Sequence, residues 1–352
     1  MIISEWVDCE NEKTAILDLT RKVFGDVEYA TPSYFDWQYI DNPQGKAIVL
    51  LAKDEEKNNS VVGLEAIIPT KIIVDQKIIM TSLSCNSAID PAYRKQGIFS
   101  KLLASIQDKA LKNGISSLYA VPNDKSFNAF IKQGSVEIVN LPLLVRPLKL
   151  SKYFDTPLRT LLQPFDSIWK INKNINSDIE QSMNEYNSDF ETLTAKASKR
   201  VTIIQKRDKE FLQWRYGKHP TRKYQTFVLK ENSVLKGYII TRQTILNGKI
   251  IGVIVDFLVD AEVKNREKLK DLVKTALENF WKNDASLVIA TCRNGLLENK
   301  ILRETGFFTT PQFLKPQSLH FILMPFDANN QSLKKLQIFG NWFFSFGDYD
   351  VF

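Results

Sequence analysis

A short basic loop between a predicted strand and a predicted helix gives the clearest chemical signal in this sequence. The apolar run 78–89 is followed by Asp90-Pro91, the loop reads Arg94-Lys95-Gln96-Gly97, and a helix is predicted directly after it. The first backbone N–H groups of a helix have no partner within the helix, and the helix dipole favours negative charge there. The loop can therefore bind an anion, because Gly97 allows a phosphate to approach the backbone and Arg94 and Lys95 add positive charge.

The spacing of this loop excludes two common phosphate motifs. A P-loop needs Gly-x4-Gly-Lys-Ser/Thr, and a dinucleotide fingerprint needs Gly-x-Gly-x-x-Gly. The loop resembles instead the pyrophosphate loop of the GCN5-related N-acetyltransferase (GNAT) family, Arg/Gln-x-x-Gly-x-Gly/Ala, which reads here Arg94-Lys95-Gln96-Gly97-Ile98-Phe99. Phe99 departs from the small residue of the pattern. Taken alone, the loop is equally compatible with an ordinary strand-to-helix turn.

The elements predicted around the loop follow the order of the GNAT fold. The first forty residues are predicted to be helical, with helices at 10–24 and 32–42. Strands at 47–53, 61–74 and 78–89 come next, and then a helix from Ile98 to Lys112, a strand at 117–121, a helix at 126–133 and a final hairpin at 136–150. We therefore expect an α/β fold with a mixed sheet over residues 1–150.

The second half of the chain repeats the first. Segment 34–43 aligns with 211–220, with Trp, Tyr and Pro at the same internal spacing. Four further pairs follow at offsets of 170 to 174 residues, namely Gly63 with Gly237, Asp90 with Asp260, Asn123 with Asn294, and Gly134 with Gly306. This internal duplication predicts two tandem GNAT-like domains, 1–150 and 196–330. A helical connector and linker (151–195) would join them, and an aromatic and acidic tail (331–352) would dock on them.

The two copies differ at the loop. Residues 260–267 contain no glycine, and Glu262 and Glu267 lie where a pyrophosphate would bind. Negative side chains there would repel phosphate. Only the first copy is therefore expected to bind the cofactor.

The family resemblance implies acetyl-CoA or another acyl-CoA as the cofactor. It places the pyrophosphate on residues 94–100 and the pantetheine arm along the end of strand 78–89, where that strand separates from 117–121. Asn123 has an alternative role as a turn or N-cap residue. The implied cofactor-binding residues are Ser87, Ala88, Ile89, Arg94, Lys95, Gln96, Gly97, Ile98, Phe99, Ser100, Asn123 and Ser126.

The expected reaction is direct attack of an amine on the thioester, aided by a base. Glu65 is a candidate because it lies within an otherwise apolar strand, which places a carboxylate either at an exposed edge or at a functional site. Asp256 lies four residues before Asp260, as Asn86 lies four residues before Asp90. Because both copies have a polar residue at this position, we expect each of the two side chains to face a cavity. The alternative is a buried side chain whose hydrogen bonds are made within the protein. Asn86 is accordingly a substrate-binding candidate.

The C-terminal segment supplies further candidates. Its pattern Trp-x4-Gly-Asp-x-Asp, from Trp342 to Asp350, is similar to tandem acyltransferases of bacterial surface-sugar synthesis. That resemblance implies that Asp348 takes part in catalysis and that Asp350 binds the amino group of an amino sugar on a nucleotide or lipid carrier; a solvated acidic tail is the alternative. Arg215 and His219 are candidates for substrate binding in a cleft. The alternative is that both side chains are exposed to solvent.

The composition limits which other classes of protein the chain could belong to. The 352 residues carry a net charge of +7, which suits a phosphate-bearing ligand, but the basic residues are spread along the chain and form no nucleic-acid stripe. Three separated cysteines and two histidines predict no metal site and a reducing compartment. No signal peptide or membrane span is predicted, so we expect a cytoplasmic protein. An N-acyltransferase for an amino acid, peptide or antibiotic, and a non-catalytic coenzyme A sensor, are the alternative functions. The sequence predicts no oligomeric state.

Overall fold

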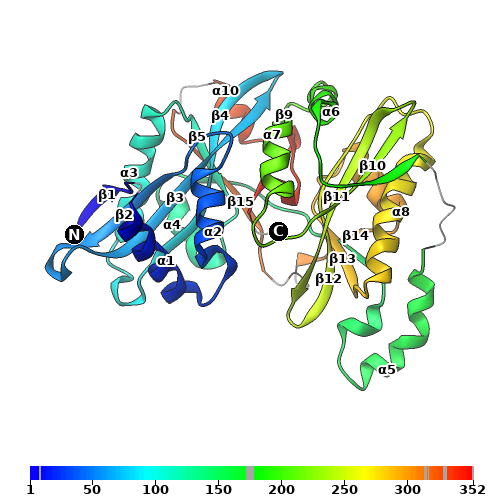
Figure 1. Cartoon of the computed structure of the whole chain (residues 1–352), viewed down its shortest axis with the longest axis horizontal. Coiled ribbons are helices and arrows are strands. Elements are labelled where there is room, and N and C mark those ends of the chain that lie inside the picture. Colours follow the sequence, from blue (N-terminus) through cyan, green and yellow to red (C-terminus); the bar gives the residue numbers. More distant parts are fainter. Residues whose placement is uncertain (8, 172–177, 313–314, 316, 328–330, 351–352) are drawn as a thin grey trace. The chain divides into compact units, whose positions relative to one another are not determined.

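The computed structural model describes residues 1–7, 9–171, 178–312, 315, 317–327 and 331–350 (Figure 1). Its residues group into two units, neither of which is one continuous segment. The first unit comprises residues 1–140, 218–221 and 317–341. The second unit comprises residues 141–217, 222–316 and 342–352. Among the described residues, no helix combines the length and apolar character needed to cross a membrane.

The first unit is built on a mixed sheet with the strand order β1-β2-β3-β4-β5-β15-β6. Neighbouring strands are antiparallel except for β4 and β5, which are parallel. The strands are β1 (Ile2–Glu5), β2 (Ile48–Asp54), β3 (Ser60–Val74), β4 (Lys77–Ile89), β5 (Ser117–Ala120), β15 (His320–Pro325) and β6 (Val136–Asn140). Strand β1 corrects the prediction of an entirely helical start, since residues 2–5 pair with β2.

Helices cover both faces of this sheet because alternate strand residues are apolar on each face. Ile48 and Leu50 of β2 pack with the apolar stripe of α3, whereas Val49 and Leu51 pack with α1 and α2. The helices are α1 (Glu10–Phe24), α2 (Pro32–Phe35, continued by a π-helical turn at Asp36–Ile40), α3 (Ile98–Lys112), α4 (Asp124–Lys132) and α10 (Gln331–Leu336). Short 3₁₀ turns lie at Glu28–Ala30, Glu55–Lys57, Pro91–Tyr93 and Phe339–Asn341.

The second unit repeats this plan with the strand order β14-β7-β13-β12-β11-β10-β8. Its parallel pair is β12 with β13, the counterpart of β4 with β5. Its strands are β14 (Phe308–Thr309), β7 (Leu144–Pro147), β13 (Leu287–Ala290), β12 (Lys249–Val259), β11 (Val234–Leu246), β10 (Gln225–Glu231) and β8 (Ile179–Ser182). A parallel pair also joins β16 (Trp342–Phe343) to β9 (Ile203–Gln205).

The helices of the second unit also match the duplication. The short helix α7 (Lys209–Leu212) continues into a π-helical turn at Gln213–Gly217, as α2 does at the aligned position. The other helices are α5 (Leu158–Leu162), α6 (Ser188–Ser198), α8 (Arg266–Lys282) and α9 (Leu297–Glu304), with 3₁₀ segments at Leu150–Tyr153, Gln163–Trp169 and Phe346–Asp348. The predicted α/β fold of two tandem GNAT-like sheets is confirmed.

The predicted hairpin at 136–150 is wrong. Strand β6 pairs with β15 in the first sheet, whereas β7 pairs with β13 and β14 in the second. The connection between them contains Pro142 and no hairpin turn sequence, so nothing local favours their pairing. Each sheet thus includes one strand from a distant part of the sequence, and the units do not coincide with the expected ranges 1–150 and 196–330.

Candidate active site

A β-bulge lies where strands β3 and β4 pair in the first unit. Ala66 pairs with Cys85 and Leu64 pairs with Ala88, so Glu65 lies opposite two residues, Asn86 and Ser87. Asn86 has a left-handed backbone with φ of 55°. Such bulges bend a strand and redirect its side chains, and they are frequent beside active sites.

Beyond the bulge, β4 separates from its parallel neighbour. Strands β4 and β5 pair only at Ser82 and Leu83 among the described residues, and β5 ends at Ala120 while β4 continues to Ile89. The Asp90 N–H donates to the Val62 carbonyl on the β3 side at 2.9 Å. Because backbone groups alternate along a strand, those of Ile89 face away from β3, along the open edge. There the Ile89 carbonyl accepts one long hydrogen bond, from Nε of the exposed Arg94 at 3.4 Å. An extended ligand could pair with this edge.

The loop after β4 leads directly from that edge to the start of α3. Lys95 and Gly97 have left-handed backbones, with φ of 63° and 74°. Gly97 caps α3 without a side-chain hydrogen bond, and the first helical turn contains no acidic residue. Open space surrounds the position that a Gly97 Cβ would take. Residues 94–97 are exposed, so the N–H groups and the basic side chains can reach an anion from solvent.

Phe99 does not obstruct this cradle. Its ring packs edge-on against Phe130 of α4, with 5.3 Å between the ring centroids, and contacts the core under α3. The departure from the small residue of the family pattern is therefore accommodated in the core. Ile98 is buried in the same core, and Ser100 is half-buried on the first turn.

Glu65 is a fully buried carboxyl group beside the bulge. Its Oε1 accepts a hydrogen bond from the Ser84 hydroxyl at 2.7 Å, and its Oε2 has no partner of ordinary hydrogen-bond geometry among the described residues. Burial raises the pKa of Glu65 to about 7, while the hydroxyls of Ser87 and Ser84 offset part of that rise. A carboxyl group with this pKa suits proton transfer near neutral pH.

A second polar group lies on the other face of β4. Asn86 Nδ2 donates to the side-chain oxygen of Gln38 at 2.5 Å and contacts the Tyr39 hydroxyl at 3.1 Å. Gln38 is 1% exposed, and its Nε2 has no partner among the described residues. Our sequence reasoning missed Gln38. The aligned pairs Trp37-Gln38-Tyr39 and Trp214-Arg215-Tyr216 could have revealed it, since a polar residue lies between the two aromatic residues in both copies.

Asn123 caps helix α4. Its side chain accepts hydrogen bonds from the backbone N–H groups of Lys125 at 3.0 Å and Ser126 at 3.2 Å. The Ser126 hydroxyl donates back to the Asn123 carbonyl at 3.3 Å. Asn123 therefore acts as the N-cap of α4, which was the alternative role. Cofactor binding by Asn123 and Ser126 stays a prediction.

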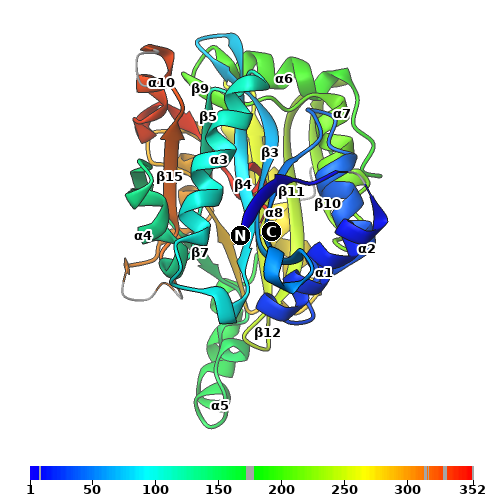
Figure 2. The same ribbon diagram turned by 90° about the vertical axis from the view of Figure 1, so that its left-hand side faces the viewer.

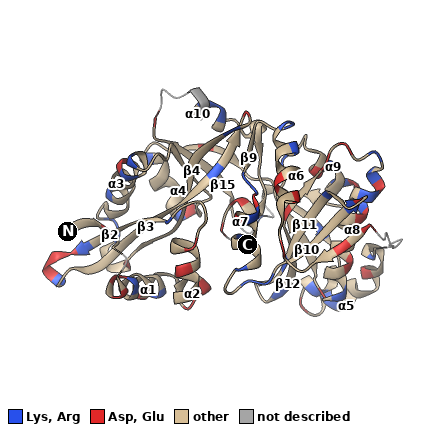
Figure 3. Ribbon diagram, turned by 45° about the horizontal axis from the view of Figure 1, so that its top comes forward, with Lys and Arg blue, Asp and Glu red and all other residues tan. Residues whose placement is uncertain are grey.

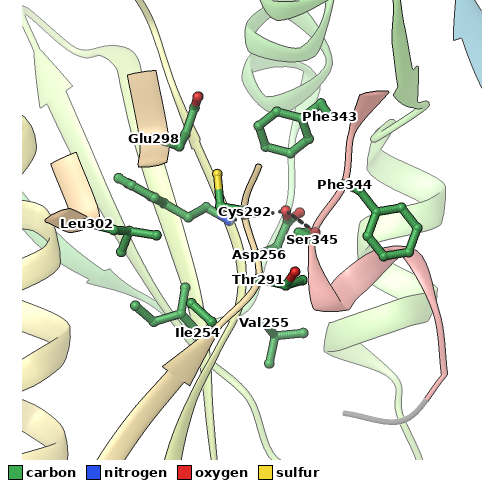
Figure 4. A pocket seen from close by; sticks show the side chains of 12 residues that line it. Ile254, Val255, Asp256, Thr291, Cys292, Glu298, Leu302, Phe343, Phe344 and Ser345 are labelled. Carbon is green, nitrogen blue, oxygen red and sulfur yellow. Dashed lines mark hydrogen bonds between the residues drawn. The ribbon is translucent and has the colours of Figure 1, made fainter. Parts of the chain in front are cut away.

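The second unit has a bulge close to the corresponding place, with Val255 as the extra residue, but a different environment around it. Ile240 pairs with Asp256 and Thr241 pairs with Ile254, and β12 pairs with β13 only at residues 251–253. Asp256 is 1% exposed and forms an ion pair with Arg207, with Nε–Oδ2 at 2.9 Å. It also accepts hydrogen bonds from the hydroxyls of Tyr238 at 2.9 Å and Ser345 at 3.0 Å. Figure 4 shows Asp256 and Ser345 at the adjoining small pocket.

Asp348 joins the same buried network. Its carboxylate accepts from Arg207 Nη2 at 2.9 and 3.1 Å, and its Oδ2 accepts from the Ser345 N–H at 2.7 Å. Burial raises the pKa of Asp348 to about 6; Arg207 opposes this rise and Asp256 adds to it. This geometry gives Asp256 and Asp348 a structural role around one arginine. Their catalytic roles stay predictions.

Side chains fill the place in the second unit that corresponds to the open edge of β4. Val259 precedes Asp260 as Ile89 precedes Asp90, and its N–H donates to Glu298 at 3.2 Å. Its carbonyl accepts from Arg200 at 3.1 Å, and Arg200 also binds Glu298. Asn265 caps α8 by accepting from the Glu267 N–H at 3.1 Å. The second unit therefore offers neither a free strand edge nor an open helix start.

The remaining substrate-binding candidates are largely buried. Arg215 donates to the Tyr224 hydroxyl at 3.0 Å and to the Tyr349 carbonyl at 2.9 Å. His219 packs against Trp37, with 4.1 Å between ring centroids. The Asp350 carbonyl accepts from Arg222 at 2.8 Å. The alternative of solvent exposure for Arg215 and His219 is wrong, and substrate binding by the three residues stays a prediction. The described residues contain no cluster of potential metal ligands.

Comparison with known proteins agrees with this geometry. Residues 9–128 match the acetyltransferase (GNAT) domain family. No curated protein sequence matches the chain. A GCN5-related N-acetyltransferase from Anabaena variabilis has a similar structure, with a TM-score of 0.66 and 13% identity over 93% of this chain and 74% of that one.

Two further solved structures are similar over most of the chain. N-myristoyltransferase from Saccharomyces cerevisiae, with bound myristoyl-CoA, has a TM-score of 0.61 and 14% identity over 92% of this chain and 82% of that one. A probable N-acyltransferase from Enterococcus faecalis has a TM-score of 0.60 and 11% identity over 92% and 72%. The chain thus carries an acetyltransferase (GNAT) domain within a tandem fold like that of N-myristoyltransferase, and it is an acyl-CoA-dependent N-acyltransferase.

Proposed function

We propose that the first unit alone binds acyl-CoA, and that it transfers the acyl group to a primary amine with Glu65 as the base. The open edge of β4 that leads into the glycine-started α3 is the observation that carries this proposal. The pyrophosphate would lie on residues 94–100, and the pantetheine arm would pair along residues 87–89. The second unit, with its corresponding edge filled by Glu298 and Arg200, would contribute structure and not a second cofactor site.

The cofactor supplies an activated acyl thioester. The residues around the bulge would orient the amine and accept its proton. The amine nitrogen forms a bond to the acyl carbon, the carbon–sulfur bond breaks, and the thiol leaves with a proton. Glu65 would remove the proton that the attacking amine loses, because its pKa of about 7 allows it to accept protons near neutral pH. Holding both reactants at the bulge supplies much of the acceleration. Asn86 and Gln38 would orient the acceptor from the other face of β4.

We propose further that the amine belongs to an amino sugar on a nucleotide or lipid carrier. This assignment is supported by the Trp-x4-Gly-Asp-x-Asp ending alone.

A mass-spectrometric assay tests this function. The chain is incubated with acetyl-CoA or a longer acyl-CoA and with nucleotide-linked amino sugars, amino acids, peptides and aminoglycosides. We expect an acylated amino sugar and free coenzyme A in equal amounts. Acylation of an amino acid, peptide or antibiotic would contradict the sugar assignment. Coenzyme A binding without turnover on any amine would contradict the enzymatic proposal and favour a sensor.

A further inference from the structure

Two neighbouring segments of the second unit expose an unusual number of large apolar side chains. The connector that holds α5 exposes Leu158 by 42%, Leu161 by 66%, Phe165 by 56% and Ile168 by 70%. The turn between β11 and β12 exposes Ile245 by 72%, with Leu246 and Ile250 at 38% each. An ion pair between Lys249 of the turn and Asp155 of the connector links the two segments. We call residues 150–170 and 245–250 together the apolar tip.

The connector in this tip is held in a defined conformation. The Ser151 N–H and hydroxyl both donate to Asp166, at 3.0 and 2.6 Å, and close the segment on itself. The buried Arg146 donates to the Trp169 carbonyl at 3.4 Å. Figures 1 and 2 show α5 and the helical turns next to it projecting from their own sheet. The apolar side chains are therefore displayed outward on an ordered, convex projection.

Basic residues accompany the apolar ones. Lys149, Lys152, Arg159, Lys170 and Lys249 lie in or next to the tip, together with the acidic Asp155 and Asp166. Figure 3 shows basic positions on the ribbon around α5. Lys149 and Lys152 also bind Asp284, so their charge is partly neutralised. Arg159 and Lys170 are exposed. A convex tip with apolar side chains and a positive surround matches the two forces that hold a peripheral protein on a bilayer, which are burial of apolar area and attraction to anionic lipid.

We propose that the apolar tip docks on an anionic lipid surface, with Leu161, Phe165 and Ile168 inserted at the level of the headgroups. The net positive charge of the tip selects an anionic bilayer over a neutral one. This inference does not depend on the proposed acyl acceptor, although a lipid-linked acceptor would be brought close to the enzyme by such docking.

Vesicle co-sedimentation of the full chain tests the proposal. We use vesicles of phosphatidylcholine alone, and vesicles with about one third phosphatidylglycerol, at low and high salt. Wild type should bind the anionic vesicles ~10-fold more strongly than the neutral ones, and less at high salt. The triple variant Leu161→Ser, Phe165→Ser and Ile168→Ser should lose binding by ~10-fold or more.

A matched triple variant provides the control. Ile78→Ser, Val234→Ser and Ile338→Ser remove side chains that are 58%, 53% and 57% exposed outside the tip, and binding should not change. Arg159→Glu with Lys170→Glu should weaken binding to anionic vesicles and reduce its salt dependence, which tests the charge without altering the apolar side chains. Thermal unfolding verifies that each variant is folded.

Two outcomes would overturn the proposal. One is failure of wild type to sediment with anionic vesicles, or equal binding by the tip and control variants. The other is a change of oligomeric state in the tip variant with no change in vesicle binding, which would identify the tip as an interface between copies of the chain.

Discussion

The ends of β4 and β12 have similar backbone arrangements, but the end of β4 is accessible whereas buried side chains cover the end of β12. In both units a parallel strand pair separates beside a bulge, and a lysine from the preceding helix binds the aspartate after the strand, Lys22 with Asp90 and Lys196 with Asp260. In the first unit the helix start is open, and the side-chain contact at the strand edge is a 3.4 Å hydrogen bond from the exposed Arg94 to the Ile89 carbonyl. The second fills both with Glu298, Arg200 and Asn265.

This difference separates the residues that build the fold from those that bind a ligand. The lysine–aspartate pair, the bulge and the π-helical turn occur in both units, so they serve the fold. The backbone N–H and C=O groups of an exposed strand edge can form hydrogen bonds with water. Those of a covered edge need hydrogen-bond partners within the protein. Glu298 supplies such a partner in the second unit, from the first turn of α9.

The largest expected effect is loss of turnover on removal of the buried base. Glu65→Gln keeps the shape of the side chain but cannot accept a proton, so kcat should fall by ~10²–10⁴-fold. The wild-type rate should rise with pH through about 7, and this limb should disappear in the variant. Steady-state kinetics over pH measure both effects, with the exposed Glu56→Gln as the control. An unchanged kcat would exclude Glu65 as the base.

The buried network of the second unit should show a stability effect in place of a catalytic one. Arg207→Met leaves Asp256 and Asp348 as two uncompensated buried carboxyls, and should lower the free energy of unfolding by ~3–5 kcal/mol at neutral pH. Asp256→Asn should cost less, because Arg207 keeps Asp348 as its partner. Urea unfolding gives both values. Equal stability of Arg207→Met and wild type would mean that this network does not hold the unit together.

Glu65 should also make stability depend on pH. Its pKa in the folded state is about 7, above the ordinary value of 4.5, so the folded chain holds its proton more tightly than the unfolded chain. This contribution is complete below about pH 4.5 and is lost as the pH rises through about 7, a change of ~3 kcal/mol. Urea unfolding of wild type and Glu65→Gln across this range isolates the contribution, because all other groups are common to both. Parallel stability curves would refute the raised pKa.

Basic residues that follow the strand should contribute to coenzyme A binding in the first unit only. Arg94→Ala with Lys95→Ala removes two charges beside the cradle and should weaken coenzyme A binding by ~5–30-fold, with reduced salt dependence. The matched pair in the second unit, Lys264→Ala with Arg266→Ala, should leave the dissociation constant unchanged. Fluorescence or calorimetric titration measures both. A comparable loss in the matched pair would mean that the second unit contributes to cofactor binding.

The smallest effect concerns the cap of α4. Asn123→Ala should cost ~1 kcal/mol of stability through loss of the cap, with little change in coenzyme A affinity. Ser126→Ala, which keeps the Asn123 cap, is the control. A fall in affinity well beyond the stability effect would show that Asn123 contacts the cofactor as well.

Much of the fold could be predicted because it is encoded locally or twice. The helix at Glu10–Phe24 and the loop around Gly97 follow from short-range pattern and glycine chemistry. The duplication followed from residues that recur at a nearly constant offset. The pairing of β6 and β7 could not be predicted in this way, since alternation of apolar residues shows that a segment is a strand but not which strand lies beside it.

The candidate site was predictable in outline but not in its side-chain partners. Glu65 could be identified because a carboxylate in an apolar strand is costly without a reason. Asp256 was interpreted in the same way, yet Arg207 neutralises it, and Arg207 is 49 residues away in the sequence with no pattern linking the two. Gln38 lies at the position that the repeat aligns with Arg215, so a residue-by-residue comparison of the copies would have revealed it.

Calorimetric titration of the full chain with coenzyme A tests most directly whether only the first unit is open to the cofactor. We expect one molecule bound per chain, binding lost in Gly97→Asp, and binding kept in Asn265→Asp, which preserves the cap of α8. Two molecules per chain, or binding that survives Gly97→Asp and disappears in Asn265→Asp, would contradict the account.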